Sequence, residues 1–241
     1  MKTLTITEAD SLAAKFRSDL GLGLAEPINA KTLIRKLGVT LVYRPLSENS
    51  FGISCMSGQK RFMLVNSNST RGRQHFTIAH ELYHLYFDEK PMPHMCGDGA
   101  DGEEKNANRF ASSLLMPREG VLTMVSKEEI MGHKVTLATV LKLEQYFGVS
   151  RITLLIRLKD IGLISQQQLE ALKAVGVKES AREYGYDMSL YESGNEGLVI
   201  GDFGEKARSL FEAGKISEGH YNELMNMLYG REEKTPSVAV R

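Results

Sequence analysis

The stretch H-E-L-Y-H, residues 80–84, lies inside a run from Thr70 to Asp88 whose pattern predicts one helix. Residues four apart lie about 40° apart around a helix axis, so His80 and His84 are expected to point the same way. Two imidazoles one turn apart can chelate one zinc ion, and Glu81 can reach a metal-bound water without binding the metal. Zinc lowers the pKa of such a water to about 7, and a carboxylate can take its proton as the water attacks a carbonyl. The pattern indicates metallopeptidase chemistry.

The surroundings of this stretch strengthen the prediction. Apolar residues cover most of the helix circumference, which is typical of a helix buried on nearly all sides: Phe76, Ala79, Leu82, Tyr83, Leu85, Tyr86 and Phe87. Polar groups buried without partners cost several kcal/mol, so the two histidines and the glutamate need partners. The alternative to a metal site is a buried His-Glu-His cluster that ordinary hydrogen bonds satisfy.

A catalytic zinc ion takes three protein ligands and keeps one position open, so a third ligand is expected. The metzincin spacing is absent because Phe87 and Lys90 occupy the places of its glycine and histidine, and the inverted H-x-x-E-H order is absent too. A second helix is predicted from near Asp101 to Met116, where Pro117 ends it. One face of this helix carries Glu104, Ala107, Asn108, Ala111 and Leu115. The two alanines allow close packing on the first helix, which makes Glu104 the favoured third ligand.

Other assignments remain open at this point. Asp101 and Glu104 also fit a capping box, in which the glutamate side chain folds back onto the start of its own helix. Glu103, His94 and Cys96 are further ligand candidates. His94 and Cys96 lie in a Pro/Gly-rich loop, where an incidental role is favoured over metal binding. The loop from Glu89 to Gly102 is placed to control access to the cleft of the predicted peptidase.

H-E-L-Y-H followed some twenty residues later by E-x-x-A-N-R-F-A-x-x-L-L-M-P resembles the ImmA/IrrE family of metallopeptidases, over about residues 25 to 175. The resemblance implies a gluzincin-like site with one Zn²⁺ per chain, held by His80, His84 and Glu104, with Glu81 as general base. It also implies a bacterial or phage protein paired with a helix-turn-helix repressor that it cleaves or inactivates. One branch of the family responds to DNA damage, and others belong to mobile elements or toxin-antitoxin-like pairs. The residues after about 176 are too few for the sensor-like domain of the best-known branch, which argues against direct ligand sensing.

Composition predicts a soluble cytoplasmic protein. The chain has 241 residues, 42% apolar and 25% charged, with a formal net charge of zero. This balance gives no whole-chain attraction to nucleic acid. Two cysteines, Cys55 and Cys96, make no disulfide framework, which suits a reducing compartment. No apolar run is long enough for a signal peptide or a membrane span.

The predicted fold is α+β: a zincin-like peptidase domain (1–125), a helix-turn-helix-like region (126–175) and a helical extension with a flexible tail (176–241). Helices are expected near 7–20 and after Pro27, followed by strands 39–44, 51–56 and 61–66 in a small antiparallel meander. Its edge strand either binds an extended substrate or merely covers the core. Helices near 204–214 and 217–229 precede a tail (232–241) expected to be disordered.

Residues 136–163 give a weaker functional indication. Helix 136–147, a turn at Gly148 and helix 151–161 have the helix-turn-helix outline. A DNA-reading second helix is exposed and begins with basic or amide side chains, whereas this one carries five aliphatic residues that favour burial. We therefore predict a structural or partner-docking role and no direct DNA binding. The tyrosines at 184, 186 and 191 could form a protein-recognition surface or pack onto the peptidase domain.

Two functions compete on this evidence. The first is a zinc endopeptidase that cuts one regulatory protein, a helix-turn-helix repressor or antitoxin. The second is a binding module that sequesters such a partner, or a toxin-antitoxin component, with zinc as a structural element. The intact Glu81 favours the first, because a structural site has no use for a general base.

Overall fold

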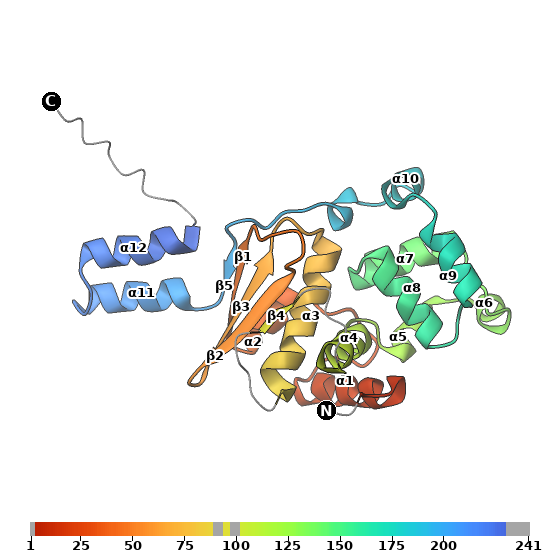
Figure 1. Ribbon diagram of the computed structural model, residues 1–241, viewed down its shortest axis with the longest axis horizontal. Coiled ribbons are helices and arrows are strands. Elements are labelled where there is room, and N and C mark those ends of the chain that lie inside the picture. Colours follow the sequence, from red (N-terminus) through yellow and green to blue (C-terminus); the bar gives the residue numbers. More distant parts are fainter. Residues whose placement is uncertain (1–2, 89–93, 97–101, 230–241) are drawn as a thin grey trace.

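The computed structural model describes residues 3–88, 94–96 and 102–229, with only the backbone of 94–96 and 227–229. Its centre is a five-stranded sheet of order β4-β2-β3-β1-β5 (Figure 1). β2 (Gly52–Ser57) and β3 (Lys60–Asn66) form the expected antiparallel hairpin. β1 (Val39–Arg44) instead pairs with β3 in parallel, from Val39 opposite Arg61 to Arg44 opposite Asn66. The α+β class is confirmed, but the expectation of an antiparallel meander is wrong, because the sheet is mixed.

The loop between β1 and β2 explains this pairing. Parallel β1 and β3 end at the same edge of the sheet, so the chain crosses the end of β3 before β2 begins. The buried side chain of Asn66 holds this crossing. Its amide donates to the carbonyls of Ser47 and Ser50 at 3.1 and 2.8 Å, and its Oδ1 accepts from the Leu46 amide at 3.0 Å. One buried side-chain amide thus supplies hydrogen-bond partners for the backbone groups of a loop that has no regular structure of its own.

Two short strands complete the sheet. β4 (His94–Cys96) pairs antiparallel with β2, and β5 (Val199–Ile200) pairs antiparallel with β1. Residues 94–96 therefore form an edge strand, where the sequence predicts only loop. The rest of the predicted gating loop, 89–93 and 97–101, lies outside the described residues.

Four helices pack around the sheet. α3 (Arg71–Phe87) lies on β2 and β3, α4 (Gly102–Leu115) lies on α3, and α1 (Ile6–Asp19) lies on α4, while α2 (Ala30–Lys36) packs on β1 (Figure 1). Edge-to-face and tilted contacts join aromatic rings of three of these helices, with centroids 5.1 to 5.9 Å apart: Phe16, Tyr83, Phe87 and Phe110. Such ring pairs stabilise the packing beyond their buried area.

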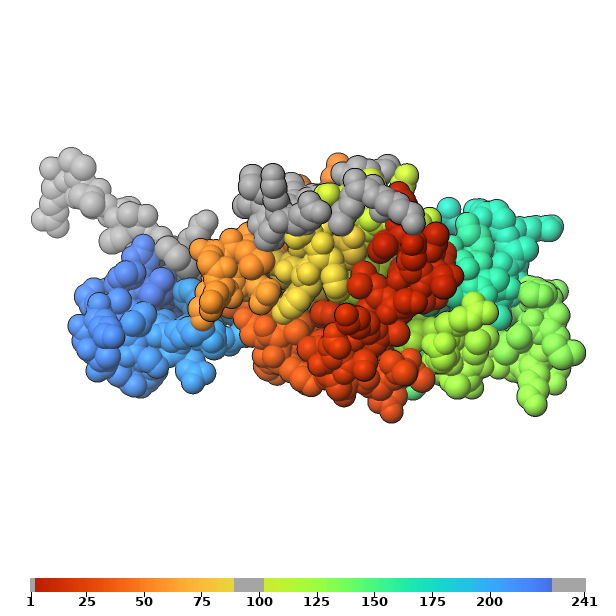
Figure 2. All heavy atoms as spheres, turned by 90° about the horizontal axis from the view of Figure 1, so that it is seen from below, coloured from red at the N-terminus to blue at the C-terminus, as the bar shows by residue number. Residues whose placement is uncertain are grey.

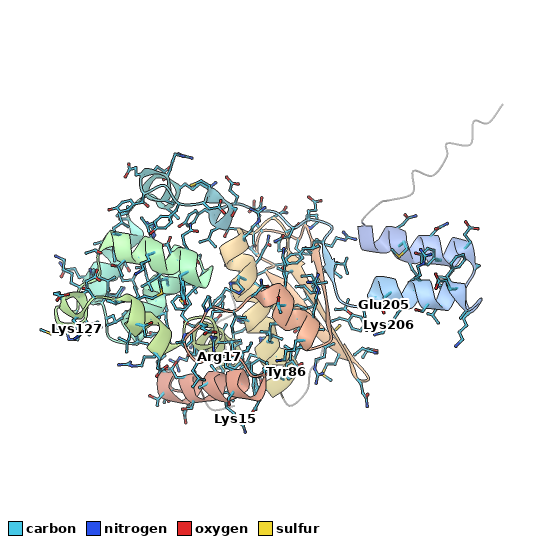
Figure 3. The ribbon with its side chains drawn as sticks, turned by 180° about the vertical axis from the view of Figure 1, so that it is seen from behind. Lys15, Arg17, Tyr86, Lys127, Glu205 and Lys206 are labelled. Atoms are coloured by element: carbon cyan, nitrogen blue, oxygen red, sulfur yellow. The ribbon has the colours of Figure 1, made fainter. Side chains whose placement is uncertain are left out.

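A buried arginine fixes the position of α1. The Arg17 guanidinium is 1% exposed and donates to the carbonyls of Leu114 and Gly23 at 2.7 and 2.9 Å, and to that of Glu26. Lys15, on the same helix, points away from the body of the protein (Figure 3). The carbonyl of Leu114 lies at the end of α4, so Arg17 links α1 to the helix that carries Glu104.

The next six helices after α4 are α5 (Arg118–Met124), α6 (Lys127–Met131), α7 (Leu137–Phe147), α8 (Arg151–Asp160), α9 (Gln166–Lys173) and α10 (Val177–Glu183). The helix-turn-helix outline is present, with Gly148 in a left-handed conformation (φ 64°) at the end of α7. One apolar core runs without interruption from Ala13 and Tyr83 to Leu143, Leu158 and further residues of this region. The predicted peptidase and helical regions therefore share a core.

The C-terminal part returns along the sheet and then leaves it. The short helix η1 (Met188–Tyr191) packs against α3, and the chain then forms β5. α11 (Phe203–Glu212) and α12 (Glu218–Tyr229) form a hairpin at the opposite end of the molecule from α6 to α9 (Figures 1 and 2). Both lie close to their predicted ranges, while the predicted tail lies outside the described residues. No helix in the described part of the chain is long and apolar enough to cross a membrane.

Candidate metal centre

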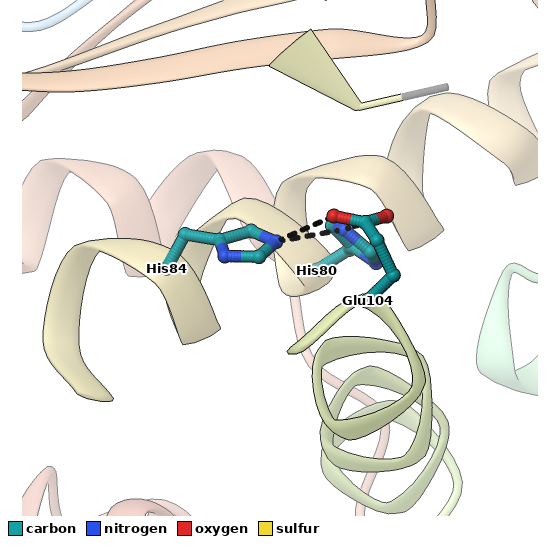
Figure 4. A group of neighbouring side chains, drawn as sticks. All are labelled: His80, His84 and Glu104. Atoms are coloured by element: carbon teal, nitrogen blue, oxygen red, sulfur yellow. Dashed lines mark hydrogen bonds and ion pairs between the residues drawn. The ribbon is translucent and has the colours of Figure 1, made fainter. Parts of the chain in front are cut away.

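α3 forms where the sequence predicts it because its ends are well defined. Thr70 caps the start, its Oγ1 accepting from the Arg73 amide, and Asp88 is the first residue beyond the last turn. The helix is buried on the face that carries the motif: His80 is 5% exposed, Glu81 0% and His84 3%. α4 crosses this face and places the buried carboxylate of Glu104 opposite the two imidazoles (Figure 4).

The spacing of the three side chains fits a tetrahedral metal site. Nε2 of His80 and Nε2 of His84 lie 3.1 Å apart, and each lies 3.4 or 3.3 Å from an oxygen of Glu104. Ligand atoms about 2.0–2.1 Å from a tetrahedral zinc ion lie about 3.3 Å from one another. Two imidazole nitrogens and one carboxylate oxygen are also a ligand set that zinc accepts in catalytic sites. The residues therefore fit a metal ion with one position left open.

The other imidazole nitrogens are held by hydrogen bonds that orient both rings. Nδ1 of His80 donates to Oδ1 of Asn108 at 3.0 Å, and Nδ1 of His84 donates to Oδ2 of Asp88 at 2.6 Å. These bonds leave Nε2 of each ring as the metal-facing atom, and such outer partners commonly orient metal-binding histidines. Burial lowers the pKa of His84, but hydrogen bonds to Glu104 and Asp88 and the nearby charge of Glu81 outweigh it and raise that pKa to about 9.

Glu81 lies beside this cluster in an unusual environment. The side chain is fully buried, and neither carboxylate oxygen has a hydrogen-bond partner among the described residues. Gly52 of β2 makes room for it: a Cβ at that position would lie 2.8 Å from Oε1 of Glu81 and 2.5 Å from Cγ2 of Thr77. A buried carboxylate without partners is costly, so its retention beside a metal-type cluster is consistent with a proton acceptor for a reacting water.

The structure separates the third-ligand candidates. Glu104 is 3% exposed and faces the histidines, whereas Glu103 is exposed. Among the described residues, the one group of three or more His, Cys, Asp or Glu side chains that could hold a metal ion is His80, His84 and Glu104, with ligand atoms within 4.8 Å of one another. Asp101, the other half of the alternative capping box, lies outside the described residues. The backbone of His94 and Cys96 runs along the edge of β2, with Cys96 opposite Gly52.

Comparison with protein families agrees with this geometry. The model of the IrrE N-terminal-like domain, Peptidase_M78, matches residues 34–159, just over half of the chain. The chain belongs to this family. The match begins in α2 and includes β1 to β4, both helices of the cluster and the pair α7 and α8. The IrrE N-terminal-like domain is a zincin-like peptidase fold, and the chain is thus a member of a metallopeptidase family. No curated protein matches the chain.

Three residues of this site were not recognised as functional from the sequence. The sequence predicts Asp88 only as a helix end and Asn108 only as one residue on the Glu104 face. Gly52 was not singled out, although a glycine inside a strand can mark a close approach by another part of the protein. Asn108 lies four residues after Glu104 and Asp88 four after His84, so helical spacing could have indicated both as orienting partners.

Proposed function

We propose that this protein is a zinc-dependent endopeptidase that cleaves and inactivates one regulatory protein, a helix-turn-helix repressor or antitoxin. The observation that carries the proposal is the buried cluster of His80, His84 and Glu104 with the unpartnered carboxylate of Glu81 beside it. A structural metal site would require the first three residues and would have no use for the fourth.

Each residue has a distinct role in the proposed reaction. A bound zinc ion would act as a Lewis acid on the scissile carbonyl and would favour ionisation of water. His80, His84 and Glu104 would hold this ion, while Asn108 and Asp88 keep the two imidazole rings in place. Glu81 would take the proton of the attacking water and pass it to the leaving amine.

The substitution Glu81→Gln tests the proposal. It keeps the shape of the side chain and removes the proton acceptor, so we expect cleavage to fall about 10²-fold to 10⁴-fold or more while zinc content stays the same. The experiment is to co-express the chain with the regulatory protein encoded next to it and to follow that partner by mass spectrometry. Glu103→Gln, an exposed change on α4, is the matched control.

The same experiment separates cleavage from sequestration. Under our proposal, new termini form in the partner with the wild-type chain and with Glu103→Gln, and none form with Glu81→Gln. If Glu81→Gln inactivates the partner as well as the wild type does, and no new termini appear with either, the protein is a zinc-containing binding module. Little activity on a generic substrate such as casein is expected, because a peptidase of regulatory function must be restricted in its substrates.

A further inference from the structure

A cavity of about 330 Å³ lies beside the start of α3. Four parts of the chain form it: the α3 cap Thr70, the start of α8, the facing ends of α9 and α10, and η1. Thr70 precedes His80 by ten residues, which is about 15 Å along a helix. The cavity is therefore separate from the proposed peptidase site, and a small ligand in it would not touch the metal centre.

The wall of this cavity is mainly apolar. Ile152, Val177 and Leu190 line it together with Tyr191. Ile152 is 41% exposed, so the cavity leaves a large aliphatic side chain in contact with water. Covering such surface is favourable in proportion to the area removed from water. The volume is at the lower end of the range for small-molecule sites, about 300–1,000 Å³, so the cavity suits a small ligand with an aliphatic group.

Several polar groups of the wall are already engaged inside the protein. The hydroxyls of Thr70 and Ser150 accept from backbone amides in the first turns of their own helices. The guanidinium of Arg151 and the hydroxyl of Tyr191 both donate to the buried carboxylate of Glu144. These contacts hold the cavity in shape, and they leave the choice of ligand charge to other side chains.

Two lysines give the cavity its charge. Lys173 and Lys178 both line it and both are exposed, and none of the described residues that line it is acidic. Lys173 also lies 3.9 Å from Glu170, but an exposed pair of this kind is weak and a ligand carboxylate can replace it. An anion is thus favoured over a cation at this cavity. We infer that the cavity binds a small carboxylate that carries an aliphatic chain, with the chain against Ile152 and the carboxylate at the two lysines.

Octanoate, a straight aliphatic carboxylate, is a suitable probe. The zinc-loaded full chain is labelled with ¹³C at the isoleucine δ1 methyl groups, and the Ile152 signal is followed by NMR during a titration. A carboxylate can also bind a zinc ion, so a signal from the cavity itself is needed. We expect the Ile152 signal to shift and to saturate, which gives the dissociation constant at this cavity.

Three further probes separate the contributions of chain and charge. Hexanoate lacks two methylene groups, each of which contributes about fourfold when buried, so it should bind about tenfold more weakly. Octanamide keeps the chain without the charge and should bind about threefold more weakly or less tightly still. Octylammonium carries the opposite charge and should be the weakest of the eight-carbon probes.

Substitution of the two lysines localises the preference for charge. We expect the double variant Lys173→Gln and Lys178→Gln to bind octanoate no more tightly than octanamide, with unchanged affinity for octanamide. Lys142→Gln is the matched control, because Lys142 is exposed on α7 and does not line the cavity. It should keep the full preference for octanoate.

A competition experiment distinguishes two sources of the carboxylate. Acetyl-Ala-Leu with a free carboxyl group imitates an apolar C-terminus of a protein. Tighter binding of this dipeptide than of octanoate would assign the site to such a C-terminus, and the reverse order would assign it to a free aliphatic carboxylate. Three results would overturn the inference: no shift of the Ile152 signal with octanoate, equal affinities for octanoate, octanamide and octylammonium, or a loss of preference in Lys142→Gln as complete as in the double variant.

Discussion

At the scale of single residues, the site depends on atoms that hold the imidazoles as much as on the imidazoles themselves. His80 and His84 can present Nε2 to one point because Asn108 and Asp88 engage both Nδ1 atoms. Glu104 reaches the same point from a different helix. Each of these contacts joins one side-chain atom to one partner. Single substitutions should therefore show how much each side chain contributes to metal binding.

We predict about one zinc ion per purified chain and its loss when His80, His84 or Glu104 is replaced by alanine, since two protein ligands hold zinc poorly. The measurement is zinc content by mass spectrometry after dialysis. Glu103→Ala, one position away and exposed, should keep its zinc. Loss of zinc with Glu103→Ala and not with Glu104→Ala would show that the third-ligand assignment is wrong. If neither matters, the ligand lies in the segment with His94 and Cys96.

A second prediction concerns Gly52. An alanine there would place its Cβ 2.8 Å from Oε1 of Glu81 and 2.5 Å from Cγ2 of Thr77, far inside ordinary contact. Such overpacking typically costs about 1–3 kcal/mol, and here it would also displace the proposed base. We expect Gly52→Ala to lower both the free energy of unfolding in urea and the rate of cleavage. Gly219→Ala in α12, where the nearest atom is 3.9 Å away, should lower neither quantity, since alanine favours a helix more than glycine does. Wild-type behaviour of Gly52→Ala would refute the close contact.

At the scale of elements, much of the fold followed from the sequence. α3 and α4 lie within one or two residues of their predicted limits because Thr70 and Pro117 mark a start and an end. The β2–β3 hairpin was recognisable from its turn. The parallel pairing of β1 with β3 was not, because alternation in a strand does not identify its neighbour. β4 and β5 have three and two residues, too short for any pattern.

The helix-turn-helix-like pair illustrates a different limit. Its apolar residues predict that the pair is buried. The partners of its charged residues, however, come partly from distant segments of the chain. Glu144 of α7 is fully buried and accepts from Nε of Arg151 at 2.5 Å and from the Tyr191 hydroxyl at 2.8 Å, and Arg151 also donates to Ser180. Burial raises the pKa of Glu144, while the hydrogen bond and charge of Arg151 oppose that shift. Tyr191 is therefore packed inside, whereas Tyr184 is 51% exposed.

We predict that Glu144→Gln lowers the free energy of unfolding by about 3 kcal/mol, because removing one charge of a buried pair leaves the other uncompensated. Urea denaturation followed by circular dichroism measures this change. The control is Glu212→Gln, which removes the partner of Arg208 on the exposed face of α11 and should leave stability nearly unchanged. Equal effects of the two substitutions would mean that the buried network contributes no more than a surface pair.

At the scale of the whole molecule, the family match and the core differ in extent. The match covers residues 34–159, yet α1 lies before it and supplies Ala13 and Phe16 to the same core. The segment around η1 binds the start of α3 through the Arg71 amide and the Glu192 carbonyl, 2.8 Å apart. The division at residues 125 and 175 stays a prediction, since the shared core shows how the regions pack and not whether each folds alone.

The last prediction concerns DNA binding. It depends on the net charge of the chain and on the burial of the basic side chains of α8. The chain carries 30 basic and 30 acidic residues, so no net attraction draws it to a phosphate backbone. A recognition helix reads bases with exposed polar side chains near its start. In α8, Arg151 is 3% exposed and forms an ion pair with Glu144. Arg157 is 1% exposed, forms an ion pair with Asp10 and donates to the Met116 carbonyl.

We therefore expect no sequence-selective binding of the isolated chain to duplex DNA at physiological salt, and a structural or protein-docking role for α7 and α8. The measurement is a gel shift with the promoter of the gene and a scrambled duplex of equal length, with a sequence-specific helix-turn-helix repressor on its own operator as the positive control. Weak binding that is equal for both duplexes and disappears as salt increases would be non-specific and consistent with this expectation. Tight binding to the promoter alone would contradict it, because Arg151 and Arg157 could reach bases only if they left their buried positions.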